Sequence, residues 1–362
     1  MKREADVLVI GAGILGSSVA YYLAKRGKRV IVLEKGEICS GTSSTTAALV
    51  LPSPKTPAVY NRLAWAGYER IRGLEQELGR KFELQITGST MLCRKEEEAN
   101  SMKKTIQVNG ENGKELEWLS PEEIIKREPI LNPKAFCGGV YCKDGGNLNP
   151  FLLVNAYIQA AKELGVQVCT FTEVQGFTSK GHQITEVHTN QGDFFGGQVI
   201  CAAGNSSILF SHMLGFEAHI YNTRGLILVS EKLPPVLHST YAEMHQSADG
   251  NILLGANFRN VEKGCNDRRT YYDELQEVCD DIGFLAPALK EIKIIRTYAG
   301  IRILPEDGLP IVGKIKEDGN FWIYVMHSAF SSAPELSWQL SEVICADLEE
   351  KSLKPFAYER FL

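Results

Sequence analysis

The sequence predicts an α/β protein made of two discontinuous domains, and three observations support this. Short apolar strands alternate with amphipathic helices in residues 1–87, 143–215 and 300–362, as in a sheet whose parallel strands are linked by helices. Strand and hairpin patterns dominate residues 88–142 and 216–299, which favours a second, mainly antiparallel sheet domain. A glycine-rich turn directly follows the first apolar strand, which is typical of a doubly wound sheet. We therefore expect a small-molecule site between the two domains.

The composition narrows the class of protein. The chain has 362 residues, of which 44% are hydrophobic and 23% charged, as in an ordinary soluble globular protein of more than one domain. The 39 Lys and Arg against 44 Asp and Glu give a net charge of −5, so we expect no basic surface for nucleic acid or anionic lipid. No apolar run is long enough to span a bilayer and no signal-type cleavage site is evident, which predicts a cytoplasmic protein. The nine cysteines include no CxxC pair, and we interpret them as reduced thiols rather than metal ligands.

The N-terminal segment predicts a dinucleotide-binding unit. Residues 5–10, ADVLVI, indicate a buried parallel strand, and Gly11, Gly13 and Gly16 follow in the G-x-G-x-x-G pattern at the start of a helix. The first glycine permits the tight turn, the second lets a pyrophosphate approach the backbone, and the third lets helix and strand pack closely. A second strand ends at Glu34, which can accept a hydrogen bond from a ribose hydroxyl. NAD and FAD both present an ADP moiety, so this Rossmann-like unit alone does not distinguish them.

The middle of the chain supplies the remaining elements. Small hydroxyl residues in 36–52 predict a loop, which lies either near the cofactor or simply at the surface. Residues 57–79 show helical spacing that stops at a glycine, and Asn149 with Pro150 predicts a capped helix leading into a parallel strand. A further helix is expected at about 266–282.

The C-terminal segment predicts a strand, a turn of small residues and a helix. Ser332 and Glu335 fit a capping box, with Pro334 in the first turn. The residues before the helix would lie at its N-terminus, which stabilises negative charge such as that of a reduced flavin. An ordinary capped terminal helix explains the same pattern.

Five segments occur in an order that resembles a known family. They are VLVIGAGILGSSVAYYLAKRGKRVIVLEKG, DGGNLNPFLLVNAYIQAAKELGVQV, VICAAGNSS, RTYAGIRILPEDGLPIVG and HSAFSSAPELSWQLSEVI. Together they look like the D-amino-acid oxidase superfamily of FAD-dependent oxidoreductases, over essentially the whole chain. Within it the chain is most similar to the group of glycine oxidase, sarcosine oxidase β-subunit and D-hydroxyproline or opine dehydrogenase. The resemblance implies a Rossmann-like FAD-binding domain with a mainly antiparallel substrate domain. It also implies non-covalent FAD, since GIRILPEDG holds no cysteine.

The resemblance assigns cofactor contacts to specific positions. The glycine turn would hold the pyrophosphate, the end of the second strand the adenosine ribose, and the small-residue loop the path to the flavin ring. The last stretch would wrap the flavin's pyrimidine edge. The expected contacts are Gly11, Gly13, Ile14, Leu15, Gly16, Glu34, Lys35, Thr42, Ser43, Ala47, Ala48, Leu49, Val174, Ala203, Gly204, His327, Ser328, Ala329, Phe330, Ser331, Ser332 and Ala333.

Arg302 is the main substrate-binding candidate. It lies between two isoleucines, where a buried strand would favour an aliphatic residue, and an unpaired buried guanidinium costs several kcal/mol. The resemblance implies that it binds the substrate carboxylate, for which its planar fork is suited. The alternative is an internal ion pair with Glu306 or Asp307. Related glycine oxidases carry a second arginine where this chain has Ala329, so carboxylate binding is expected to differ here.

Three further side chains lie on strands that could face the flavin. Tyr241 and His245 are candidates for substrate contact, and so is Arg224, although an ordinary position on the surface or in the core of a strand is the better explanation of each. No catalytic residue is identified. The segment ILLGANFRN lacks the lysine that monomeric sarcosine oxidases use for oxygen, which favours another electron acceptor.

These features predict an FAD-dependent oxidase or dehydrogenase acting on the C–N bond of a small amino or imino acid. Glycine, sarcosine, proline, hydroxyproline or a D-amino acid would pass a hydride to the flavin. One alternative is a flavin-carrying β-type subunit of a hetero-oligomer, active only with partner chains; a homo-oligomer is a further expectation left open. The other alternative is an NAD-dependent dehydrogenase.

Overall fold

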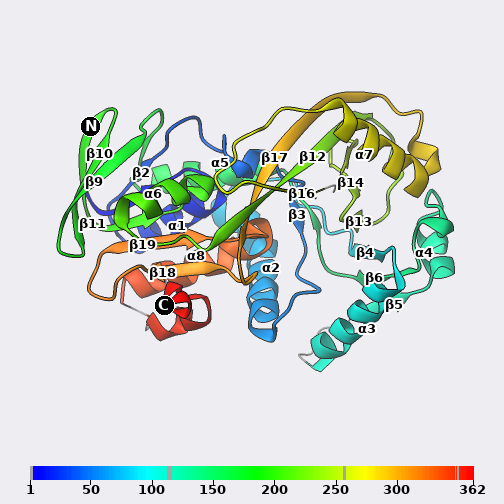
Figure 1. Ribbon diagram of the computed structural model, residues 1–362, viewed down its shortest axis with the longest axis horizontal. Coiled ribbons are helices and arrows are strands. Elements are labelled where there is room, and N and C mark those ends of the chain that lie inside the picture. Colours follow the sequence, from blue (N-terminus) through cyan, green and yellow to red (C-terminus); the bar gives the residue numbers. More distant parts are fainter. Residues whose placement is uncertain (1–2, 112–115, 256–257, 347, 349) are drawn as a thin grey trace.

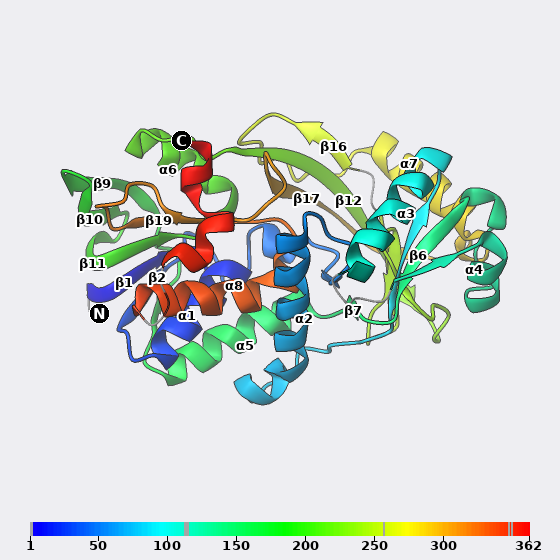
Figure 2. The ribbon, with the colours of Figure 1, turned by 90° about the horizontal axis from the view of Figure 1, so that it is seen from below.

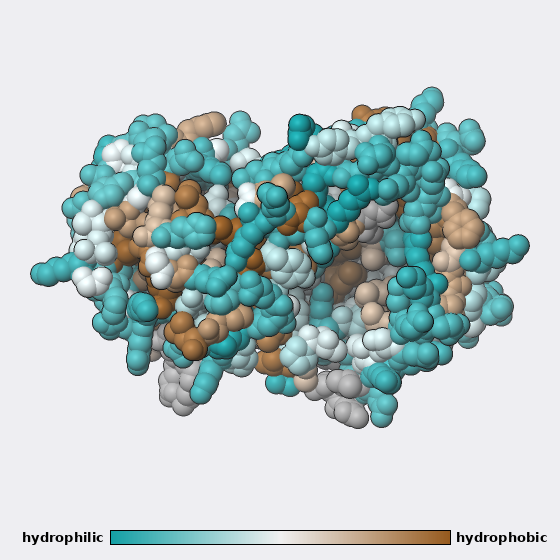
Figure 3. Space-filling view, viewed as in Figure 1, coloured by the Kyte–Doolittle hydropathy of each residue, from teal (hydrophilic) through white to brown (hydrophobic). Residues whose placement is uncertain are grey.

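The computed structural model describes residues 3–111, 116–255, 258–346, 348 and 350–362 of the chain. The molecule is elongated, with a large sheet and its helices towards one end and smaller sheets towards the other (Figure 1). Viewed from the same side, its surface is hollowed between these two parts, with hydrophobic residues at the floor of the hollow (Figure 3).

The large sheet has eight strands, of which β18–β19–β11–β1–β2–β8 form the main path and β10 and β9 extend from β11. Five strands of this path are parallel, and β18 runs antiparallel to β19. Val7, Leu8 and Val9 are fully buried because both faces of the sheet are covered, which confirms the predicted first strand. The strands are β1 (Glu4–Ile10), β2 (Val30–Leu33), β8 (Gln167–Cys169), β9 (Val174–Lys180), β10 (Gln183–Thr189), β11 (Gly192–Cys201), β18 (Ile311–Lys314) and β19 (Phe321–Val325).

Helices α1, α5 and α8 cover one face of this sheet, and α2 lies beside them (Figure 2). α1 packs on both α5 and α8, and α2 packs on α8. The start of α5 is capped as expected, because Asn149 Oδ1 accepts from the backbone N–H groups of Phe151 and Leu152, both at 3.2 Å. A shorter helix, α6, buries Ile208 and Phe210 in a separate hydrophobic cluster of the sheet that includes Leu8, Val199 and Phe321. The helices are α1 (Ile14–Lys25), α2 (Ala58–Leu78), α5 (Pro150–Glu163), α6 (Ser207–Leu214) and α8 (Ala329–Ile344).

The other end of the molecule is built mainly from antiparallel strands. β17 pairs with β12 along almost its whole length, and β15 and β16 share the opposite edge of β12. A second sheet has the order β13–β4–β6–β5, and β3 pairs with β7. The strands are β3 (Leu49–Val50), β4 (Ser89–Cys93), β5 (Glu117–Leu119), β6 (Gly138–Cys142), β7 (Gly146–Asn147), β12 (Ile220–Lys232), β13 (Thr240–Tyr241), β14 (Met244–Gln246), β15 (Asn251–Leu254), β16 (Phe258–Val261) and β17 (Ile294–Pro305). The helices are α3 (Glu96–Glu111), α4 (Pro121–Arg127) and α7 (Tyr272–Leu285).

The predicted domain boundaries remain predictions. β17 continues through the division proposed between residues 299 and 300, so one strand serves both parts of the molecule.

Two helix starts were predicted wrongly. α7 begins at Tyr272 rather than near residue 266, because Asp267 accepts from the backbone N–H of Arg269 and from the Tyr271 hydroxyl, which favours a turn over a helix. α8 begins at Ala329, so Ser332 and Glu335 lie inside the helix and form no capping box. The Glu335 carboxylate instead accepts from Arg70 and Gln339.

Candidate active site

The glycine turn between β1 and α1 has no room for side chains at two positions. Gly11 has a φ of +107°, and a Cβ there would lie 2.6 Å from the carbonyl oxygen of Ala202. A Cβ on Gly16 would collide with the carbonyl oxygen of Gly11. Gly13 precedes α1 and offers no side chain to cap it, and the Ile14 N–H donates to Ser43 Oγ at 3.1 Å. The start of α1 is therefore open to an anionic group.

Acidic and basic side chains lie beside this turn. The Glu34 carboxylate accepts from the backbone N–H groups of Ala12 at 2.7 Å and Gly36 at 2.9 Å. Lys35 Nζ donates to Ser206 Oγ at 3.0 Å. Glu34 thus holds the glycine turn in place. Its expected hydrogen bond to a ribose stays a prediction.

The small-residue loop is fastened to β17. Thr42 donates to the carbonyl oxygen of Ile301 at 3.0 Å, and the Tyr298 hydroxyl donates to that of Thr46 at 3.1 Å. Gly300 must be small, because a Cβ there would collide with the carbonyl oxygen of Thr45. The loop therefore lies between the glycine turn and β17.

The start of α8 is a second open helix N-terminus. Ser328 precedes the helix with a φ of +55° and makes no cap to it through its side chain. Ser331 Oγ accepts from the Leu51 N–H at 2.9 Å, whereas Ser332 Oγ is buried with no partner in the described part of the chain. An orphaned hydroxyl and free N–H groups suit a polar ligand edge.

The structure brings most of the expected cofactor contacts to the carboxyl ends of β1, β2 and β11 and to the starts of α1 and α8. Ala203 and Gly204 follow β11 directly, and Val174 is buried at the start of β9. A glycine turn with no room for side chains and two uncapped helix starts fit a dinucleotide carrying a second polar ring.

Arg302 is held by a histidine rather than by an acid. Its Nε and Nη2 lie 3.2 and 2.6 Å from Nε2 of His327, and its guanidinium carbon lies 3.8 Å from the centre of the Phe258 ring. His327 Nδ1 lies 3.0 Å from Ser328 Oγ, to which Lys55 Nζ donates at 3.0 Å. Arg302, His327, Ser328 and Lys55 thus form one connected row, which we call the cation row.

The predicted alternative partners of Arg302 are engaged elsewhere. Glu306 contacts His219 at 3.2 Å, and Asp307 binds Arg360 at 2.6 Å. Among the described residues no carboxylate lies within 4.0 Å of Arg302 or Lys55, so the internal ion pair considered from the sequence is not formed.

Burial and like charge set the protonation of the cation row. The pKa of His327 is lowered to about 3 by burial and then by the charges of Arg302 and Lys55, so the imidazole is neutral. Burial and the Arg302 charge lower the pKa of Lys55 to about 8. Burial also lowers the pKa of Arg302, although a guanidinium remains charged near neutral pH.

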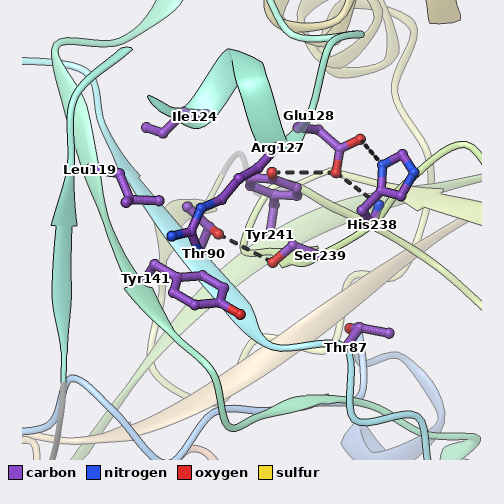
Figure 4. Close-up of a pocket in the computed structure, with 10 residues that line it drawn as sticks. All are labelled: Thr87, Thr90, Leu119, Ile124, Arg127, Glu128, Tyr141, His238, Ser239 and Tyr241. Atoms are coloured by element: carbon purple, nitrogen blue, oxygen red, sulfur yellow. Dashed lines mark hydrogen bonds and ion pairs between the residues drawn. The ribbon is translucent and has the colours of Figure 1, made fainter. Parts of the chain in front are cut away.

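Among the described residues, Tyr241, His245 and Arg224 make no hydrogen bond or ion pair with the cation row, although Arg224 is next to Arg302 in the register of β12 and β17. Figure 4 shows the Tyr241 hydroxyl facing the buried carboxylate of Glu128, 3.4 Å away, in a cavity of about 290 Å³. His245 lines a different cavity of about 200 Å³. Arg224 is ion-paired with Glu274 and also donates to backbone carbonyls, so it is not open to substrate. The positions of Tyr241 and His245 give no support for contact with the substrate, which stays a prediction.

Sequence reasoning missed Lys55 and the link between Arg302 and His327. Lys55 lies in PSPKTP, a proline-rich stretch in which a lone lysine is the only charged residue. Its partner is 273 residues away, so no local pattern reveals the contact.

Comparison with known proteins defines the class. A family model described as FAD dependent oxidoreductase matches residues 6–342, and the chain belongs to this family. FAD, rather than NAD, is therefore the cofactor of this chain.

Individual relatives refine this picture. The chain is 29% identical over 340 residues to the beta subunit of sarcosine oxidase from Rhodobacter capsulatus, covering 88% of this chain and 80% of the relative. It is 26% identical to glycine oxidase of Bacillus subtilis, covering 95% and 94%. Among solved structures, L-proline dehydrogenase from P. horikoshii matches with a TM-score of 0.90 at 26% identity, over 100% of this chain and 98% of that one. Glycine oxidase from Geobacillus kaustophilus, at 24% identity and a TM-score of 0.90 over 98% of each chain, shares the fold.

None of the helices in the described residues is long and apolar enough to cross a membrane.

Proposed function

We propose that this protein oxidises the C–N bond of a small amino or imino acid whose carboxylate is held by Arg302. The observation that carries the proposal is the state of Arg302: partly buried, positioned by His327, and without an acidic partner among the described residues. A carboxylate ligand would neutralise the charge of a partly buried guanidinium in this state and accept its remaining hydrogen bonds. Relatives named as glycine oxidase, the beta subunit of sarcosine oxidase and L-proline dehydrogenase support the same substrate class.

The chain's own residues bind and orient the substrate. His327 engages Nε and Nη2 of Arg302, which leaves Nη1 and the outer N–H groups to a carboxylate. Phe258 covers one face of the guanidinium, which reduces its access to water and strengthens the charge interaction. His327 is neutral and the row contains no carboxylate base, so the amine would bind in its neutral form.

The cofactor would be held by the two open helix starts. Gly11, Gly13 and the first turn of α1 would receive the pyrophosphate, and residues 328–333 the pyrimidine edge of the flavin. Bound FAD would supply the acceptor for a hydride from the substrate carbon.

An anaerobic substrate screen tests the proposal. Holoenzyme is mixed with glycine, sarcosine, proline and D-amino acids, and loss of flavin absorbance is recorded. We expect bleaching with at least one of them. Arg302→Ala should raise the half-saturating substrate concentration at least about 100-fold, because a buried charge contact is lost. The exposed Arg72→Ala should behave as wild type. Bleaching of Arg302→Ala at wild-type concentrations would contradict the carboxylate role.

A second candidate function is that of a flavin-carrying component of a hetero-oligomer. Its support lies in two relatives that are named as subunits: the beta subunit of sarcosine oxidase and, at 23% identity over 99% of this chain, a subunit of opine oxidase from Rhizobium meliloti. Purification of the tagged chain from its own cells tests this. A stoichiometric partner that is required for turnover would favour the hetero-oligomer; full turnover by the isolated chain would exclude it.

A further inference from the structure

Lys55 is held in place at the end of the cation row opposite Arg302. It lies in the loop between β3 and α2, and its Nζ is 3.0 Å from Ser328 Oγ and 5.6 Å from the centre of the Tyr60 ring. The loop is fastened just before Lys55, since the Leu51 N–H donates to Ser331 Oγ and Ser53 Oγ accepts from Trp65 Nε1 at 2.7 Å. Its position is therefore set by the structure.

The protons of the cation row have only one consistent arrangement at neutral pH. Arg302 can only donate, so Nε2 of His327 accepts and Nδ1 carries the imidazole proton. That proton goes to Ser328 Oγ, which also accepts from the Lys55 ammonium. Both lone pairs of the hydroxyl are then used, and its own proton can go to the Tyr60 hydroxyl, with which Ser328 makes a side-chain hydrogen bond.

The cation row therefore contains two cations, Arg302 and Lys55, and no acid. Like charges placed together in a partly buried site are unfavourable without an anion. The groups facing Lys55 are Arg302 on β17, His327 and Ser328 before α8, and Tyr60 on α2. Burial raises the pKa of the Tyr60 phenol, so Tyr60 stays neutral and supplies no negative charge.

Position 329, directly after the serine that Lys55 contacts, is an alanine and adds no charge of its own beside the cation row. We propose that Lys55, reaching in from the loop before α2, supplies the second cation that binds the substrate carboxylate together with Arg302. This rests on the proposed function for the identity of the ligand as an amino or imino acid.

Acetate binding tests the proposal without turnover. Holoenzyme is titrated with acetate while the flavin absorbance spectrum is recorded, using wild type, Lys55→Met, Lys55→Arg and the exposed control Lys81→Met. We expect Lys55→Met to weaken acetate binding at least tenfold, with Lys55→Arg and Lys81→Met within threefold of wild type. A change of less than threefold in Lys55→Met overturns the proposal, even if its flavin content or ligand-free spectrum changes, because Lys55 would then serve the cofactor alone.

The pH dependence gives a second readout. Below the pKa of about 8 the Lys55 ammonium is charged and acetate affinity should be level; above it, affinity should fall up to tenfold per pH unit. Lys55→Met should lose this fall and Lys55→Arg should shift it to higher pH. An unchanged profile in Lys55→Met counts against the proposal. If acetate binding depends on Lys55 while no amino acid bleaches the flavin, the anion site stands and the proposed function fails.

Discussion

Two arginines on adjacent strands differ in whether their charge is used by the fold. Arg224 on β12 and Ile301 on β17 are cross-strand partners, so Arg224 and Arg302 lie close along the same pair of strands. Arg224 is 5% exposed and paired with Glu274, whereas the side chain of Arg302 contacts a neutral histidine and an aromatic ring but no acid among the described residues. The first charge stabilises the fold and the second is available to a ligand.

Methionine at each position should separate these roles. Arg224→Met takes its nearest cation from Glu274, whose side chain is 13% exposed, leaves it only the more distant Arg259 at 3.8 Å among the described residues, and should lower the free energy of unfolding by about 3 kcal/mol. Arg302→Met removes a desolvated charge and should change that energy by less than about 1 kcal/mol while abolishing acetate binding. Urea unfolding and acetate titration of both variants measure the contrast. Equal destabilisation by the two substitutions would mean that Arg302 is structural.

His245 gives a pH dependence of stability. Burial lowers its pKa from 6.5 to about 4, so below pH 6.5 the unfolded chain binds a proton that the folded protein does not. Its stabilising contribution is complete above pH 6.5 and is lost as the pH falls towards 4, by about 3 kcal/mol in total. Urea unfolding between pH 4 and 8 should show this loss in wild type and a correspondingly smaller one in His245→Gln. If the free energy of unfolding of wild type and His245→Gln fell equally with pH, the buried neutral His245 would not be the cause of the loss.

At the scale of elements, α2 contains two glycines with different surroundings. A Cβ on Gly67 would collide with the carbonyl oxygen of Ser331 at the start of α8, whereas nothing lies within 4 Å of a Cβ on Gly73. Gly67 therefore sets the distance between the two helices and Gly73 does not.

Alanine at these positions should have opposite effects. Gly73→Ala should raise the free energy of unfolding by about 0.5–1 kcal/mol, because it reduces the entropy of the unfolded chain. Gly67→Ala should lower it by about 1–3 kcal/mol and reduce flavin content, because the start of α8 must move. Urea unfolding and the ratio of flavin to protein absorbance report both. If Gly67→Ala retains full flavin and stability, the close approach is not required.

Elements with a local cause could be predicted, and elements set by distant contacts could not. The strand–glycine–helix unit and the Asn149 cap follow from neighbouring residues, and both were confirmed. The start of α8 was misplaced because Ser332 and Glu335 match a capping box, while the real cap position, Ser328, is fixed by contacts with Lys55 and His327. Arg302 could be singled out because it interrupts an apolar strand, but nothing near it in sequence indicates His327 or Lys55.

At the scale of the whole molecule, the expected cofactor site draws on separated stretches of the chain. Residues 11–16, 203–204 and 327–333 follow different strands of one sheet, and residues 42–49 bridge them to β17. A ligand that contacts all four stretches should stabilise the protein as a unit.

Removal of FAD should therefore loosen distant segments together. At FAD concentrations 100 times its Kd, the free energy of unfolding should exceed that of the apoprotein by about 2.7 kcal/mol. Hydrogen exchange should show protection gained at 42–49 and 327–333 as well as at 11–16. Gly16→Ala, which cannot form the glycine turn, should gain none. Protection confined to the N-terminal stretch would contradict the shared site.

The two cations of the row differ in how freely they can change over evolution. Arg302 belongs to β17, and a shift in its register would move every pair that this strand makes with β12. Lys55 belongs to a short loop held by a few side chains, so a substitution or insertion there leaves the sheets undisturbed. Descendants of this chain should therefore inherit the arginine unchanged and diversify their substrates through the loop.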